Sequence, residues 1–73
     1  MQLQKRGMRG AETALLQLGL SRAGEYRGLP DGIFGPVTEN AVRAFQRREG
    51  LAEDGIAGEK TWERLAPWLG GYG

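Results

Sequence analysis

Two aspartates open two copies of one short motif, so a carboxylate site is the first chemistry to consider in this chain. Asp31 begins the stretch "DGIFGPVT" and Asp54 begins the stretch "DGIAGEKT". A calcium-binding EF-hand loop needs oxygen ligands at alternating positions and a closing glutamate, whereas these motifs continue with apolar residues. A catalytic carboxylate pair is disfavoured because each aspartate lies in its own equivalent motif. We therefore predict that both aspartates form turns and that neither motif binds a metal ion.

Nucleophilic catalysis lacks its usual side chains in this sequence. The chain contains no histidine and no cysteine, which removes the commonest general base and the thiol nucleophile, together with two common zinc ligands. Ser21 is the only serine, and no histidine is present to activate it. The sequence thus predicts no catalytic residue and no cofactor.

Length and charge restrict the function further. With 73 residues and a net charge of +1, the chain is one small domain without the strong positive field of a nucleic-acid-binding protein. No apolar run approaches the roughly 20 residues of a membrane span. The opening "MQLQKRGMRG" lacks the apolar core of a signal peptide, so an extracellular role would need an export signal that is absent from this sequence or an unconventional route of export. We expect no nucleic-acid or membrane partner.

The spacing of apolar residues predicts an all-α fold, a small three-helix bundle. The first helix is expected from Ala11 to about Ala23, followed by a loop over "AGEYRGLPDG". The second is expected over Pro36–Glu49, because proline suits the first helical position and Gly50 suits a left-handed cap. The third begins near residue 59 or 60 and is expected to stop or kink at Pro67, which clashes with the preceding turn.

The repeated motif describes one structural unit that occurs twice. Aligning the two aspartates also aligns Thr38 with Thr61, Val42 with Leu65, and Phe45 with Trp68. Each copy contains a tight turn, an apolar anchor (Ile33 or Ile56) and an amphipathic helix. We call residues 31–38 the first corner and residues 54–61 the second corner. Aspartate accepts hydrogen bonds from nearby backbone N–H groups, and glycine permits backbone angles that other residues avoid. The predicted turn residues are Asp31, Gly32, Gly35, Asp54, Gly55 and Gly58.

These motifs, taken together, resemble those of the bacterial three-helix peptidoglycan-binding domains. The matching strings are "RG" at Arg9, "LQ" at Leu16, "DGIFGPVT", "AVRAFQ" at Ala41, "GL" at Gly50, "DGIAG" and "TWERL" at Thr61. One departure lies in the first loop, where Glu25 precedes Tyr26. The resemblance implies a domain over residues 9–69, an N-terminal tail over residues 1–8, and a C-terminal tail or linker over residues 70–73.

The resemblance also implies a function, a location and partners. Similar domains are usually appendages of cell-wall hydrolases, so we expect a monomeric, non-catalytic module that holds a hydrolase at peptidoglycan. The expected location is the cell wall, the periplasm or the extracellular space. A protein-interaction or pro-segment module with the same fold is the alternative.

Two glutamines and two aromatic residues are the candidates for ligand contact. Gln17 and Gln46 each follow an apolar core residue on a predicted helix. They could line a shallow groove with Tyr26 and Phe34, in which amides and an aromatic face would suit sugar rings or peptide groups. Alternatively, each glutamine is a buried brace that binds the backbone of a loop. The sequence leaves both interpretations open.

Overall fold

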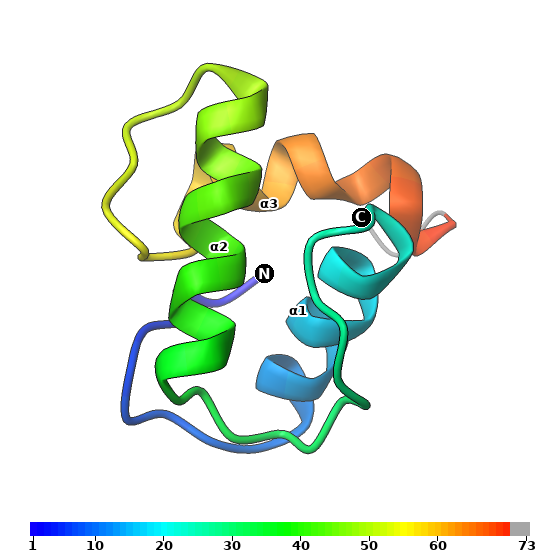
Figure 1. Ribbon diagram of the computed structural model, residues 1–73. Helices are drawn as coiled ribbons and strands as arrows, with labels where there is room; N and C mark the ends of the chain where they lie inside the picture. The colour runs from blue at the N-terminus through cyan, green and yellow to red at the C-terminus, as the bar shows by residue number, and fades with distance from the viewer. Residues whose placement is uncertain (71–73) are drawn as a thin grey trace.

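A computed structural model describes residues 1–70 of the chain, and it contains three α-helices followed by a short 3-10 helix. The elements are α1 (Ala11–Arg22), α2 (Pro36–Glu49), α3 (Glu59–Leu65) and η1 (Ala66–Leu69) (Figure 1). The predicted all-α, three-helix fold is confirmed. Within residues 1–70, extended pairing is limited to two isolated bridges.

The ends of α2 and α3 follow from local sequence signals. Pro36 lies at the start of α2, and Gly50 ends it in the left-handed conformation with φ of 73°. The N–H of Leu51 then donates to the carbonyl of Gln46 at 2.9 Å, while the N–H of Gly50 bonds to the carbonyls of Arg47 and Gln46, so the end of the helix is capped by backbone groups. At the other end of the chain, α3 stops before Pro67 and the backbone tightens into η1, as the proline predicts.

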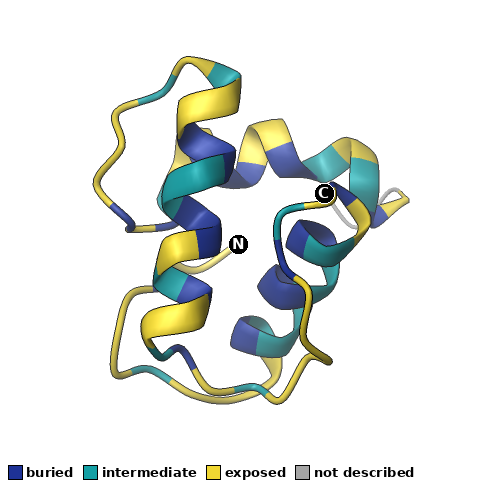
Figure 2. Cartoon of the chain, viewed as in Figure 1, coloured by how far each residue is buried: buried dark blue, intermediate teal, exposed yellow. Residues whose placement is uncertain are grey.

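The helices meet around one apolar core (Figure 2). Its fully buried members come from every helix and from both corners; among them are Leu16, Leu20, Phe34, Val42, Phe45, Ala57, Leu65 and Leu69. Gly19 lies where α1 approaches α3, because a Cβ atom there would stand 2.8 Å from the Leu65 side chain. The glycine inside the first helix therefore permits close packing and does not mark a break.

The N-terminal segment, expected to be a tail, is paired with both corners. Gln4 forms an antiparallel bridge with Ala57, through N–H to oxygen distances of 3.1 and 2.8 Å. Further along, the N–H of Gly7 donates to the carbonyl of Phe34 at 3.0 Å, and the N–H of Phe34 donates to the carbonyl of Met8 at 2.9 Å. Residues 1–8 thus belong structurally to the domain and connect its two corners.

Side chains reinforce this pairing. The Gln4 side chain is buried and accepts a hydrogen bond from the hydroxyl of Thr13 on α1. The indole N–H of Trp62 on α3 donates to the carbonyl of Gln2 at 3.0 Å. At the opposite end, Gly70 caps η1 with φ of 60°, and the rest of the predicted C-terminal tail lies outside the described residues.

Candidate functional site

The first corner is organised by one buried glutamine of α1. The Gln17 Nε2 atom lies 2.9 Å from Asp31 Oδ1, 3.0 Å from the Ile33 carbonyl and 2.9 Å from Thr38 Oγ1. Its Oε1 atom accepts a hydrogen bond from the N–H of Gly32 at 2.9 Å. Asp31 Oδ1 also accepts from the N–H of Ile33 at 2.9 Å. A single amide group therefore connects α1 to both the turn and the start of α2.

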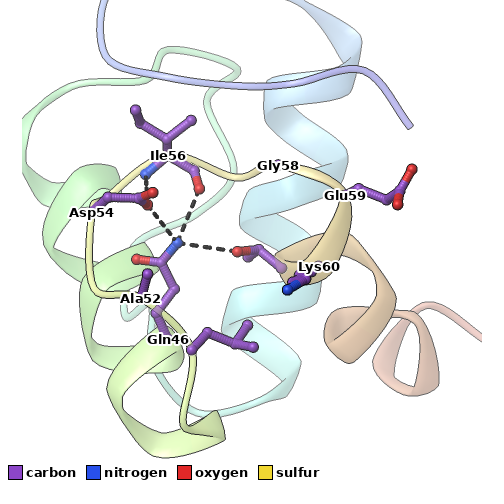
Figure 3. Close-up of a pocket in the computed structure, with 9 residues that line it drawn as sticks. Gln46, Ala52, Asp54, Ile56, Gly58, Glu59 and Lys60 are labelled. Carbon is purple, nitrogen blue, oxygen red and sulfur yellow. Dashed lines mark hydrogen bonds between the residues drawn. The ribbon is translucent and has the colours of Figure 1, made fainter.

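The second corner repeats this arrangement with a glutamine of α2 (Figure 3). The Gln46 Nε2 atom lies 2.9 Å from Asp54 Oδ1, 2.9 Å from the Ile56 carbonyl and 3.0 Å from Thr61 Oγ1. Its Oε1 atom accepts from the N–H of Gly55 at 2.9 Å, while Asp54 Oδ1 accepts from the N–H of Ile56 at 2.9 Å. The two networks match bond for bond. We call Gln17 and Gln46 the brace glutamines.

The glycines of the corners divide into two kinds. Gly32 and Gly55 have φ of 76° and 75°, a left-handed conformation that favours glycine. Gly35 and Gly58 have φ of −108° and −93°, which other residues also adopt. The expectation that all four glycines supply unusual backbone angles is therefore wrong for Gly35 and Gly58. These two residues are the N-caps of α2 and α3.

Both corner aspartates are held in the ionised state. The hydrogen bond from the Ile33 backbone, followed by that from Gln17, lowers the pKa of Asp31 below its usual value. The hydrogen bond from the Ile56 backbone has the same effect on the pKa of Asp54, with further contributions from Gln46 and from the positive charge of Arg43. Over residues 1–70, the structure contains no group of three acidic, histidine or cysteine side chains that could hold a metal ion.

The four side chains predicted to contact a ligand are all buried. Gln17, Gln46 and Phe34 are at most 1% exposed, and Tyr26 is 7% exposed. The Tyr26 hydroxyl donates to the carbonyl of Leu29 at 3.3 Å. Gln17 and Gln46 lie at different corners, so the four side chains do not line one groove. Of the two interpretations, the geometry favours the brace for both glutamines.

The surface is hollowed beside each corner. A pocket of about 300 Å³ lies against the second corner, and its walls include Leu51, Ala52, Ile56 and Lys60. We call it the corner pocket. Another hollow, of about 420 Å³, lies between the first corner and the start of α1, beside Arg9 and Asp31. Sequence reasoning missed these surfaces, because they depend on how the loops pack against the helices.

Arg48 has a role that its position on the polar face of α2 did not reveal. Its guanidinium donates to the carbonyl of Ala23 at 2.6 Å and to the carboxylate of Glu25 at 3.0 Å. It also lies 5.3 Å from the centroid of the Phe45 ring and 5.2 Å from that of the Trp68 ring. Arg48 thus connects α2 to the first loop and to η1, and Glu25 is its acidic partner.

Comparison with known proteins supplies the deciding observation. The sequence model of the family described as "Putative peptidoglycan binding domain" matches residues 9–65. The chain belongs to this family of peptidoglycan-binding domains. In solved structures, the N-terminal domain of SleB is 41% identical and aligns with a TM-score of 0.88 over 93% of both chains. The Burkholderia AP3 phage endolysin is 46% identical with a TM-score of 0.85, over 89% of this chain and 25% of that chain.

Curated relatives of this peptidoglycan-binding domain are longer proteins. The N-acetylmuramoyl-L-alanine amidase CwlM of Mycobacterium tuberculosis is 48% identical over 77% of this chain and 14% of its own length. A spore cortex-lytic enzyme of Bacillus cereus is 44% identical over 88% of this chain and 25% of its own length. The chain thus spans a quarter or less of these two relatives.

Proposed function

We propose that this chain binds peptidoglycan and holds a wall-cleaving catalytic domain at its polymeric substrate. The observation that carries the proposal is the family match over residues 9–65, together with relatives named as an amidase and a cortex-lytic enzyme. The site of action is the cell wall, in the periplasm or outside the cell. No helix of residues 1–70 is long and apolar enough to cross a membrane.

The module itself carries no catalytic role in this proposal. Its sequence lacks histidine and cysteine, and its two corner aspartates are occupied by hydrogen bonds within the turns. Binding to a polymer raises the local concentration of an attached catalytic domain without any new contact at the scissile bond. A weak affinity for each binding unit is sufficient, because the polymer offers many units side by side.

Cosedimentation with purified sacculi tests the proposal. We expect the 73-residue protein to pellet with insoluble peptidoglycan and to release no soluble muropeptides from it. A protein that stays in the supernatant at every sacculus concentration would refute the binding role and favour a protein-interaction or pro-segment module. Release of muropeptides by the pure protein would refute the non-catalytic role.

A further inference from the structure

The corner pocket has a polar floor in which the Gln46 amide and one oxygen of Asp54 are already hydrogen-bonded. The Gln46 amide is bonded to the second corner on both its nitrogen and its oxygen. Asp54 Oδ1 receives two of the hydrogen bonds in this network. An acceptor group of a ligand therefore gains little from this floor, where Asp54 Oδ2 is itself an acceptor. The apolar side chains of Leu51, Ala52 and Ile56 form the surface that it can contact.

Three charged residues line the pocket, namely Asp54, Glu59 and Lys60. Lys60 is exposed, and it makes no ion pair or hydrogen bond with any residue of the described range 1–70. Asp54, on the opposite side of the pocket in Figure 3, already has hydrogen-bond donors and the positive charge of Arg43 nearby. The side chain of Glu59 points away from the other lining residues (Figure 3). Lys60 is thus the lining cation without a partner in residues 1–70, and its complement is an anionic group of a ligand.

The size of the pocket and the burial of the aromatic residues restrict the ligand further. About 300 Å³ lies at the lower end of the range of small-molecule sites, roughly 300–1,000 Å³, so the pocket suits a small group of a larger ligand. Over residues 1–70, four of the five aromatic rings are buried in the core, and the fifth, that of Trp68, packs against Phe45 and Arg48. No open aromatic face lines the pocket to contact a sugar ring.

The first corner provides an internal comparison. Its positions equivalent to Ala52 and Lys60 hold Leu29 and Val37, which are 88% and 66% exposed. The braced turn is the same in both corners. The first corner, however, has the large side chain of Leu29 where the second has the methyl group of Ala52, and it has Val37 where the second has the ammonium group of Lys60. The pair of an alanine and a lysine at these two equivalent positions is therefore confined to the second corner, whereas the hollow beside the first corner carries Arg9 from outside the repeated motif.

We propose that the corner pocket binds a carboxylate-bearing part of the peptide stems of peptidoglycan. Lys60 pairs with the carboxylate, while Leu51 and Ile56 contact a small apolar side chain such as the methyl group of alanine. This inference rests on the proposed function, and it assigns the recognition to the peptide stems and not to the glycan strands. No covalent step is involved.

Matched variants at equivalent positions of the two corners test the location. Ala52→Trp fills the pocket, and its control Leu29→Trp adds the same ring to the first corner. Lys60→Met removes the ammonium group while keeping an aliphatic side chain, and its control is the exposed Lys5→Met. We expect Ala52→Trp to abolish cosedimentation with sacculi and Lys60→Met to weaken it about tenfold, as loss of a charged hydrogen bond does. Both controls should bind as the parent does.

Soluble competitors test the chemistry of the ligand. Acetyl-lysyl-D-alanyl-D-alanine should displace the protein from sacculi, whereas the same peptide with a C-terminal amide and tri-N-acetylglucosamine should not. Displacement by the sugar, or equal displacement by the acid and the amide, would overturn the inference.

Two outcomes separate this inference from the proposed function. If the parent protein does not pellet with sacculi, the proposed function fails. If the parent pellets and folded Ala52→Trp pellets equally, only the inference fails. Thermal unfolding of each variant shows whether it is folded, and Lys60→Arg should retain binding because it retains the charge.

Discussion

The brace glutamines carry a measurable part of the stability of the domain, and Gln46→Leu tests this directly. Leucine has a similar size but no amide, so the substitution removes all four contacts of the side chain and leaves a cavity of little volume. The N–H of Gly55 loses its partner in a buried position, and Thr61 Oγ1 loses a donor. The Ile56 carbonyl keeps a second donor, the N–H of Gly58 at 3.0 Å.

The expected loss can be worked from these groups. An unpaired buried N–H costs about 1–3 kcal/mol, and one further lost hydrogen bond costs about 1 kcal/mol, so the free energy of unfolding should fall by roughly 2–4 kcal/mol. In a domain of this size, that corresponds to a Tm lower by about 8–30 °C, at roughly 4–8 °C per kcal/mol. The usual stability per residue gives the whole domain a free energy of unfolding of about 4–11 kcal/mol, so the expected loss is a large fraction of the total.

Urea unfolding followed by far-UV circular dichroism measures the change. Gln17→Leu should cost a similar amount, because the first corner has the same hydrogen bonds. Gln2→Leu is the control. The side chain of Gln2 is exposed and makes no hydrogen bond with residues 1–70, so its loss should change stability by less than about 0.5 kcal/mol. A loss below 1 kcal/mol for Gln46→Leu, with an unchanged dependence on urea, would refute the view that the amide organises the corner.

Three further changes probe the remaining structural claims. The pKa values of Asp31 and Asp54 are lowered in the folded protein, so the stability that these carboxylates contribute is present above their ordinary pKa of about 3.9 and is lost as the pH falls through the folded value. Asp54→Asn should therefore reduce the loss of stability on the acid side of a stability-versus-pH curve. A chelator should leave the Tm of the parent protein unchanged. Gly19→Ala should lower the Tm, because its Cβ atom would stand 2.8 Å from the Leu65 side chain. An unchanged Tm would show that this contact costs no more than the roughly 1 kcal/mol that alanine gains over glycine inside a helix. Arg48→Met should lower stability and speed amide hydrogen exchange in residues 23–25. Exchange at the parent rate would show that Arg48 does not hold the first loop against α2.

The helices were predictable because their signals are local. Pro36 and Gly50 bound α2 through conformational preferences of single residues, and the observed helix has the predicted bounds. The first helix ends at Arg22, one residue before the predicted end, where Ala23 serves as the C-cap. Likewise, Pro67 predicted the change from α3 to η1.

The N-terminal segment and the buried state of the candidate ligand residues depend on contacts distant in sequence. Nothing in the spacing of residues 1–8 indicates that Gln4 pairs with Ala57 and with Thr13. Tyr26 could equally have faced solvent, and only the packing of the first loop buries it. Arg48 lies among polar residues on one face of α2, so the sequence pattern does not reveal its contacts with Phe45 and Trp68, which form only in the tertiary fold.

Comparison of the two corners distinguishes the residues that fix the backbone from the residues that differ between the copies. Each copy uses a glutamine, an aspartate, a left-handed glycine and a threonine in the same hydrogen bonds. These groups are held inside the corner, so a change in any of them disturbs the turn. The exposed positions carry no such constraint, and there the copies differ, with Leu29 against Ala52 and Val37 against Lys60. Because the braced backbones match, a difference in binding between the corners must arise from these exposed side chains and from how closely the neighbouring loops approach.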